Sequence, residues 1–321
     1  MVFDDKDFLY RLAIMYYTEG LTQQEIAQRL GISRPQISRG LARAQEVGIV
    51  RIEIIPPVEG LSYLEEQLQR ALGLHKVVVA PRMSRQGADR ENRNQDIAIC
   101  ASKFIGEFLL GKNYVGIGWG DTVYRTALDL DFATESCDTC FVPLIGSLGM
   151  QESRYQVNSI VDRISEKMRG RSMFINSPAF MHDEQTRNNT LNQKQFSSML
   201  QAWKRLDTAI IGLGVPVDYP GFPMSEFKAD NIERLKQAGV VGDILGQFFN
   251  SQGELCESGS EKEYIGIQIG DLRNIQQVIC LSGGSPKVKG IIAAARSRYF
   301  TMLVTDERTA NELVVELERM G

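Results

Sequence analysis

Residues 281–290, "LSGGSPKVKG", combine glycines, a helix start and a lysine in a pattern suited to binding an anion. The segment follows an apolar, strand-like run, and Gly283 and Gly284 leave their main-chain amides uncovered by side chains. A helix is expected to begin at Ser285-Pro286, which puts Lys287 in its first turn. Amides at a helix N-terminus and an ammonium group together make a phosphate site. An ordinary glycine turn beside a surface lysine is the alternative.

A second glycine-rich segment, "GIGWGDT" at residues 116–122, is similar at first sight to a nucleotide-binding turn. A dinucleotide fingerprint requires a third glycine at position 121, where this chain has an aspartate. It also requires an acidic residue after the next strand, whereas the nearest candidate, Asp138, precedes that strand. We therefore do not interpret the segment as a dinucleotide site.

Both segments belong to a region, from residue 75 onward, in which apolar strand-like runs alternate with helical stretches. The expected strands are residues 76–80, 114–118, 139–146, 172–180, 207–214, 264–269, 276–284 and 300–307. The expected helices lie near residues 94–110, 121–130, 152–169, 190–205, 226–238, 241–250, 286–296 and 307–319. This order predicts an α/β, Rossmann-like domain whose largely parallel sheet has helices on both faces. Ligands of such sheets bind at the carboxyl ends of strands, where glycines occur at residues 118–120, 212–214 and 283–284. The pair at residues 212–214, taken alone, is interpreted as structural.

Residues 21–48, "LTQQEIAQRLGISRPQISRGLARAQEVG", carry the most specific pattern in the chain. Thr22 with Glu25, and Ser33 with Gln36, each form a capping box that opens a helix. A glycine between the two helices supplies a left-handed turn. Two capped helices joined by so short a turn predict a helix-turn-helix, with a generic helical hairpin as the alternative.

A helix-turn-helix that reads DNA inserts the N-terminal end of its second helix into the major groove. Arginine bonds guanine through two hydrogen bonds and glutamine does the same to adenine, while residues of the first helix position the phosphate backbone. Residues 1–55 hold seven basic and seven acidic side chains, but no acid lies between Arg29 and the last arginine of the stripe, Arg43. This local basic stripe is the expected electrostatic footprint, and a solvated helix face is the alternative for any single arginine. The residues predicted to contact DNA are Thr22, Gln23, Ser33, Arg34, Gln36, Ser38, Arg39 and Arg43.

The flanking segments suggest where this unit begins and ends. Apolar groups at helical spacing predict a helix at residues 8–18, and residues 49–55 alternate like a short strand, interpreted as a wing or a lead-out strand. Four leucines line one side of an amphipathic helix at residues 61–74, which packs against the second domain or forms a dimer contact. The expected organisation is a winged-helix-like DNA-binding domain, a linker with the amphipathic helix, and an effector domain, at residues 1–56, 57–74 and 75–321.

The composition is that of an ordinary globular protein with about two domains. The 321 residues are 43% hydrophobic and 24% charged, and the net charge of −4 argues against a general polyanion binder. No cleavable leader or apolar run of membrane-spanning length occurs, so we expect a cytoplasmic protein without a membrane partner. Five scattered cysteines are typical of a reducing compartment.

Cys137 and Cys140 have the spacing of redox and zinc sites. A structural zinc needs four ligands, and the two histidines of the chain, His75 and His182, are both distant. The pair also leads into a strand and not into a helix, unlike a thioredoxin-type motif. We interpret the spacing as coincidence and expect no metal and no cofactor.

The two halves together resemble the SorC family of bacterial transcriptional regulators over essentially the whole chain. The resemblance is carried by "LTQQEIAQRLGISRPQISR", "GIGWGDTV", "VVGDILGQFF" followed by Gly253, and "LSGGSPKVKGIIAAA" leading to "LVTDERTA". It implies an effector domain related in fold to sugar-phosphate isomerases and glucosamine-phosphate deaminases, which binds a phosphorylated sugar without turning it over. It also implies dimers or tetramers on operator DNA, with the effector shifting DNA affinity.

The resemblance implies an effector site in which Asp243 faces sugar hydroxyls and Lys287 binds phosphate. Asp121 and its neighbours form one wall, the end of "VPLIGS" forms another, and a polar pair opens the following helix. Helix capping is the alternative role for both aspartates. Ile145 stands where several relatives carry a charged residue at the ligand, so a single phosphate is expected. The implied effector residues are Gly118, Gly120, Asp121, Thr122, Gly146, Ser147, Gln156, Asn158, Asp243, Gly283, Gly284 and Lys287.

The function expected from these features is that of a DNA-binding transcriptional regulator of a carbohydrate-utilisation operon. A phosphorylated sugar or polyol would modulate its binding to the operator. The alternative is a sugar-phosphate isomerase or deaminase with an accessory DNA-binding domain, which would need a carboxylate or histidine base in the pocket. Turnover of a panel of sugar phosphates distinguishes the two.

Overall fold

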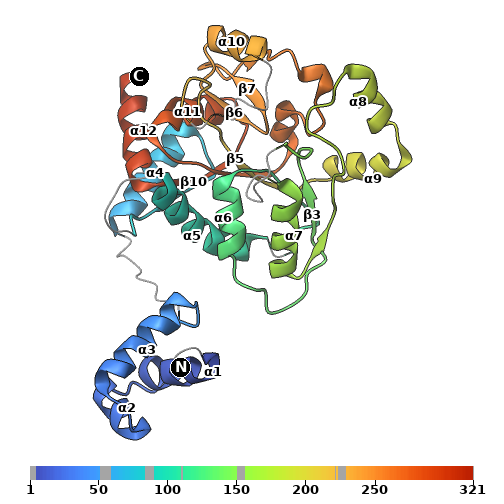
Figure 1. Ribbon diagram of the computed structural model, residues 1–321. Helices are drawn as coiled ribbons and strands as arrows, with labels where there is room; N and C mark the ends of the chain where they lie inside the picture. Colours follow the sequence, from blue (N-terminus) through green and yellow to red (C-terminus); the bar gives the residue numbers. More distant parts are fainter. Residues whose placement is uncertain are drawn as a thin grey trace. The chain divides into compact units, whose positions relative to one another are not determined.

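The computed structural model describes residues 5–50, 59–83, 90–109, 111–149, 156–220, 222 and 229–320. The chain divides into two compact units, Met1–Pro57 and Val58–Gly321, and each is described by itself (Figure 1). Within these described ranges, no helix has both the length and the apolar character needed to cross a membrane.

The smaller unit is built from short helices. α1 (Lys6–Ala13) continues into a π-helical turn, η2 (Ile14–Thr18), and is followed by α2 (Gln23–Leu30) and α3 (Arg34–Glu46). Its core consists of side chains from all three α-helices, namely Leu12, Ile26, Ala27, Ile37 and Leu41. The strand expected at residues 49–55 falls mostly outside the described residues.

The turn between α2 and α3 forms as its sequence predicts. Thr22 Oγ1 accepts a hydrogen bond from the Glu25 amide (3.3 Å), and Glu25 Oε2 accepts one from the Thr22 amide (2.8 Å). Gln36 Oε1 likewise accepts a hydrogen bond from the Ser33 amide (2.9 Å). Gly31 ends α2 in the left-handed conformation, with φ at +66°, which a residue without a side chain adopts at little cost. The predicted helix-turn-helix is confirmed.

The larger unit is an α/β domain around a seven-stranded sheet whose paired strands all run parallel. In spatial order the strands are β1 (Lys76–Ala80), β10 (Met302–Asp306), β9 (Gln277–Leu281), β5 (Thr208–Gly212), β2 (Tyr114–Ile117), β3 (Cys140–Pro143) and β4 (Arg171–Ser172). The side chains of β3 and β10 are buried along their whole length, as expected for strands covered on both faces.

Helices cover the two faces of this sheet in separate groups (Figure 1). One group, packed side by side, is α5 (Arg90–Phe108), α6 (Asp121–Asp129) and α7 (Val157–Met168). The other group is α4 (Glu59–Leu72), α11 (Val288–Arg296) and α12 (Glu307–Met320). Leu68 and Leu72 of α4 lie in the core of this domain, so the amphipathic helix packs against the effector domain.

The remaining described elements lie between residues 184 and 287. The helices are α8 (Glu184–Leu191), α9 (Lys194–Trp203), α10 (Ala229–Gln237) and the 3-10 turns η5 (Glu261–Glu263), η6 (Ile269–Asn274) and η7 (Ser285–Lys287). A small antiparallel sheet contains β6 (Gly242–Ile244), β7 (Gln247–Phe249) and β8 (Leu255–Cys256).

The helix predicted at residues 241–250 was wrong, because this segment is the β6–β7 hairpin. Pairing of Ile244 with Gln247 leaves Leu245 and Gly246 as a two-residue turn, with φ at +54° and +74°. Positive φ at both central residues is the geometry of a type I′ turn, which joins antiparallel strands. Apolar side chains on both faces of the hairpin are buried, so the segment shows no period of two that would have predicted a strand.

Three other expected elements differ in extent. Residues 264–269 form isolated bridges to Ile145 and Phe180 and no strand, and the strand expected at residues 172–180 is reduced to β4. The single helix expected at residues 190–205 is replaced by α8 and α9, which meet at the asparagine and glutamine of positions 192 and 193.

Candidate functional site

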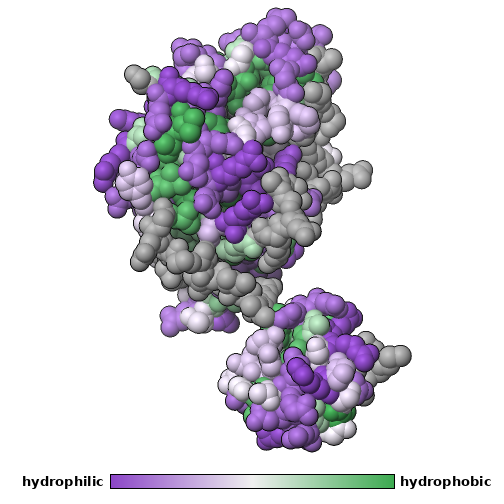
Figure 2. All heavy atoms as spheres, turned by 90° about the vertical axis from the view of Figure 1, so that its left-hand side faces the viewer, coloured by the Kyte–Doolittle hydropathy of each residue, from purple (hydrophilic) through white to green (hydrophobic). Residues whose placement is uncertain are grey.

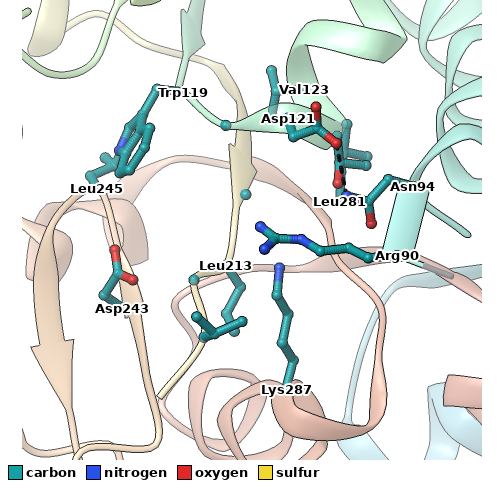
Figure 3. Close-up of a pocket in the computed structure, with 15 residues that line it drawn as sticks. Arg90, Asn94, Trp119, Asp121, Val123, Leu213, Asp243, Leu245, Leu281 and Lys287 are labelled. Atoms are coloured by element: carbon teal, nitrogen blue, oxygen red, sulfur yellow. Dashed lines mark hydrogen bonds between the residues drawn. The ribbon is translucent and has the colours of Figure 1, made fainter. Parts of the chain in front are cut away.

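The order of the strands reverses between β2 and β5. From β2 the chain adds β3 and β4 on one side, and it then returns to place β5, β9 and β10 on the other side. At such a reversal the connections leave in opposite directions, so a crevice opens at the carboxyl ends of the strands. A pocket lies at this position, open to solvent and formed by residues that follow β2, β5 and β9 together with the first turn of α5 and the β6–β7 hairpin (Figure 3).

Asp121, at the start of α6, joins two helices beside the pocket. Its Oδ2 accepts hydrogen bonds from Asn94 Nδ2 and from Arg125 Nε, both at 2.9 Å. The residue that caps α6 is Gly120, at φ +122°, and no side chain caps this helix end. Asp121 therefore lines the pocket while its carboxylate is held by α5 and α6, and it is not the helix cap.

Asp243 approaches the pocket from the opposite side, on β6 (Figure 3). It is 8% exposed, and its Oδ2 accepts a hydrogen bond from the Gly246 amide (3.1 Å) at the hairpin turn. A Cβ at position 214 would overlap Oδ1 of Asp243, so only glycine fits there. Burial raises the pKa of Asp243 to about 6, against the opposing effects of the Gly246 amide and Lys287. Its role in local structure is to cap a β-turn, so the helix-capping alternative was wrong for this residue.

Lys287, in η7, points into the cavity between the two aspartates (Figure 3). Burial, together with the charges of Arg90 and Arg93, lowers the pKa of its ammonium group to about 8. Asp243 acts in the opposite direction. The structure thus brings Gly120, Asp121, Thr122, Asp243 and Lys287 of the predicted set into one pocket.

Of the two glycines ahead of Lys287, Gly284 does not present the free amide that was expected. The Gly284 amide donates a hydrogen bond to Thr309 Oγ1 (2.6 Å), and both Gly283 and Gly284 are buried outside the pocket lining. A Cβ at position 283 would overlap Asp306 Oδ2, so the glycine there allows close packing. The prediction of a free Gly284 amide for phosphate was wrong, because α12 already uses that donor.

Five more predicted residues lie outside the pocket lining. The amides of Gly118, Gly146 and Ser147 donate to the carbonyls of Ile210 (2.8 Å), Ile265 (2.9 Å) and Ser177 (2.8 Å). Gln156 Nε2 donates to the Leu148 carbonyl (3.2 Å), and the Asn158 amide group exchanges two hydrogen bonds of 3.0 Å with the main chain of Ile175. Residues 150–155, ahead of this pair, lie outside the described ranges. In the described residues these groups brace loops at the strand ends.

The residues predicted to face DNA lie at the start of α2 and from the cap to the third turn of α3. Arg34, Ser38 and Arg39 are exposed, and neither arginine is paired with a carboxylate in the part of the chain that is described. Arg43, in contrast, pairs with Glu46 at 3.0 Å. Two arginines of the predicted basic stripe are therefore available to an anion, since Arg29 also pairs, with Glu19 at 3.5 Å.

Gln36 is already engaged within the capping box. Its Oε1 accepts hydrogen bonds from both the amide and the hydroxyl group of Ser33, each at 2.9 Å. A bidentate contact to adenine needs this oxygen as well as the amide nitrogen. In this arrangement only the nitrogen of Gln36 is available to a base.

The two units correspond to two known families of domain. Residues 56–315 match the sugar-binding domain model Sugar-bind, and residues 11–57 match a model of the MarR family. The sorbitol operon regulator of Klebsiella pneumoniae is 30% identical over 313 residues, covering 97% of this chain and 98% of that protein. The crystal structure of that full-length regulator, SorC, matches with a TM-score of 0.79 at 29% identity and covers 97% of this chain and 99% of that one. The chain belongs to the SorC family of transcriptional regulators.

The chain is also similar to regulators named for other compounds than sorbitol. The deoxyribonucleoside regulator of Bacillus subtilis is 28% identical over 310 residues, covering 95% of this chain and 96% of that protein. The resemblance stated from the sequence motifs is therefore confirmed, as is the combination of a helix-turn-helix with an α/β effector domain.

Sequence reasoning missed part of the pocket. Arg90 and Asn94 lie four residues apart in the first turns of α5 and face the cavity together. Trp119, Leu213 and Leu245 supply apolar walls. The spacing of two polar residues at a helix start was a usable signal for the first pair, whereas the apolar walls depend on strand order.

Replacing Gly214 by alanine is expected to destabilise the larger unit by about 1–3 kcal/mol, because the new Cβ displaces the buried Asp243 carboxylate. Urea unfolding measures the change in free energy. Gly212→Ala is the matched control, since its Cβ would meet the Trp119 carbonyl oxygen at 3.2 Å and no carboxylate. Equal losses in the two variants would contradict the role assigned to Gly214.

Asp243→Asn is expected to raise the free energy of unfolding at neutral pH, by at most about 3 kcal/mol at roughly 1.4 kcal/mol per pKa unit. The raised pKa means that the folded state favours the protonated carboxyl. Its stabilising contribution is full below the ordinary pKa of 3.8 and is lost as the pH rises through about 6. The advantage of the asparagine variant should therefore shrink as the pH falls below 6. A variant less stable than the wild type at neutral pH would refute this account.

Proposed function

We propose that this SorC-family regulator binds operator DNA through α3 and that a phosphorylated sugar or polyol in the pocket modulates that binding. The observation that carries the proposal is the placement of the Lys287 ammonium and the Asp243 carboxylate in one crevice at the strand reversal (Figure 3). An ammonium suits a phosphate, and a carboxylate suits sugar hydroxyls. Trp119, Leu213 and Leu245 give the carbon chain apolar walls. Names of relatives that refer to sorbitol and deoxyribonucleosides support a ligand of this kind.

On the DNA side, Arg34 and Arg39 are proposed as the principal contacts in the major groove. Arg34 is the first residue of α3 and Arg39 lies in its second turn, in the N-terminal half of the helix, which meets base edges in helix-turn-helix proteins. Two such helices must lie about 34 Å apart to meet successive grooves, which requires at least a dimer. Such a regulator acts in the cytoplasm, where operator and phosphorylated sugars occur together.

The face formed by α4 and α12 is the proposed contact between subunits. Tyr63 on α4 is 75% exposed, and Val315 and Met320 on α12 are 46% and 44% exposed. Figure 2, which looks onto the side of the effector domain that carries these helices, shows apolar side chains among polar ones. The effector would act by binding one arrangement of the subunits more tightly than the other.

One observation favours the enzymatic alternative. The pKa of Asp243, near 6, is in the range of a general base, and that of Lys287, near 8, is in the range of a general acid. Incubation with a panel of sugar phosphates tests this possibility directly. Sustained product formation would establish an enzyme, whereas binding without turnover would support the regulator.

The experiment that tests the proposed function is a thermal-shift screen of phosphorylated sugars and polyols on the full chain, followed by operator binding with and without each hit. A ligand of the native state must raise the melting temperature by mass action. Hits that leave DNA affinity unchanged, or a panel without hits, would refute the proposal.

Arg39→Ala is expected to weaken operator binding by roughly 1–3 kcal/mol if it contacts a base, and to leave the thermal shift by the effector intact. Mobility-shift titration at fixed salt measures the first effect. Lys262→Ala, which removes an exposed cation of the effector domain paired with Glu184 at 3.3 Å, is the control. Loss of the thermal shift in Arg39→Ala would contradict the assignment of the two functions to separate units.

Lys287→Ala should lower affinity for a phosphorylated effector far more than for the same sugar without its phosphate. The loss corresponds to one charged hydrogen bond, roughly 1.5–3 kcal/mol. Calorimetric titration of the two compounds measures the difference. Equal losses would remove Lys287 from the phosphate role.

A further inference from the structure

Arg90 places a second positive charge in the pocket beside Lys287. It begins α5, and Figure 3 shows its guanidinium group and the Lys287 ammonium group pointing into the same part of the cavity from different elements. Within the described residues no carboxylate forms an ion pair with either cation, although Arg125, close by, is paired with Asp121. Two like charges thus face one space, and in the described residues neither is held in an ion pair.

A third cation lies one turn along α5. The Arg93 guanidinium packs against Gly284, where a Cβ would lie 2.8 Å from one of its terminal nitrogens. Its Nε is buried and has no hydrogen-bond partner among the described residues. Together with burial, Arg90 and Arg93 lower the pKa of Lys287. The positive field at this end of the pocket therefore exceeds what one lysine would give.

The carboxylates of the pocket offset this field only in part, since Asp243 raises the pKa of Lys287 against the effect of both arginines. Asp121 is held by Asn94 and Arg125, and Asp243 approaches from the hairpin on the other side of the cavity. A phosphate monoester carries a charge of about −1.5 to −2 near neutral pH, which matches two cations, whereas a carboxylate or sulfate ester carries only one negative charge. A guanidinium group also binds two phosphate oxygens at once.

We propose that Arg90 binds the phosphate group together with Lys287, so that the pocket selects a dianionic phosphate ester over a singly charged sugar acid or sulfate ester. This inference rests on the proposed function and adds a specificity-determining residue to the same site. Arg90 is a ligand of the anion, and Lys287 is its partner in the clamp.

Methyl phosphate and methyl sulfate are suitable probes, because they share a tetrahedral shape and differ in charge at slightly alkaline pH. Their dissociation constants are obtained on the full chain from melting temperature against concentration. We expect the wild type to prefer methyl phosphate at least about tenfold, and Arg90→Gln to lose roughly 10- to 100-fold in affinity for it, as for one hydrogen bond to a charged group. Arg90→Lys, which keeps the charge, should keep the preference for the dianion.

Arg70→Gln is the matched control, since Arg70 is an exposed helical arginine paired with Glu66 at 3.1 Å. It should bind methyl phosphate as the wild type does. Equal affinity of Arg90→Gln and the wild type, with loss in Lys287→Ala, would overturn the inference and leave the proposed function intact. A wild type without preference between the two probes would also overturn it. The proposed function is tested by different experiments, namely the screen of phosphorylated sugars and the measurement of operator binding.

The pH profile supplies a readout that a purely structural role for Arg90 would not change. Phosphate affinity of the wild type should fall as Lys287 loses its proton above about pH 8. The charged and titratable groups that act on Lys287 are Arg90, Arg93, Asp243 and Cys280. Removing Arg90 removes the largest of the charge effects that lower this pKa, so the fall in Arg90→Gln should begin at higher pH. An unshifted profile would contradict the clamp.

Discussion

The reversal of strand order between β2 and β5 is the constraint on which the pocket depends. Because the chain leaves these neighbouring strands in opposite directions, a crevice lies at their carboxyl ends. The start of α6 and the loop after β5 line the opening, and η7 closes one side. The β6–β7 hairpin then approaches so closely that only a glycine fits at position 214. Each of these segments supplies only part of the lining, and the site exists only where they meet.

Burial disfavours the charged forms of both Asp243 and Lys287. The pKa of Asp243 is raised to about 6 and that of Lys287 is lowered to about 8, so each group moves toward its neutral form. A ligand that brings an anion to Lys287 and hydroxyl groups to Asp243 replaces the water that these groups lost. The resulting difference in free energy between the filled and empty pocket is what a regulator can use to shift a conformational equilibrium.

The DNA-binding unit follows a different design, in which local hydrogen bonds hold the recognition helix. The Ser33–Gln36 capping box fixes the start of α3 but engages Gln36 Oε1, which a bidentate contact to adenine would need. Of the predicted base contacts on α3, Arg34 and Arg39 are the exposed arginines without an ion pair in the described residues. Coupling between a ligand pocket and a DNA-binding unit requires two states that the ligand and the DNA distinguish.

The sequence by itself determined the features that form within a few residues. The capping boxes and the Gly31 turn were predictable because their hydrogen bonds are local, and most strands of the sheet were predictable from their apolar runs. The motifs of the SorC family pointed to Asp243 and Lys287. Tertiary structure decided the rest. The segment around Asp243 is a hairpin because burial on both faces removes any period, and the Gly284 amide is occupied because α12 brings Thr309 to it. Leu213 and Leu245 form apolar walls of the pocket, while Gln156 and Asn158 brace a loop, since strand order sets which distant segments meet and leaves no trace in local spacing.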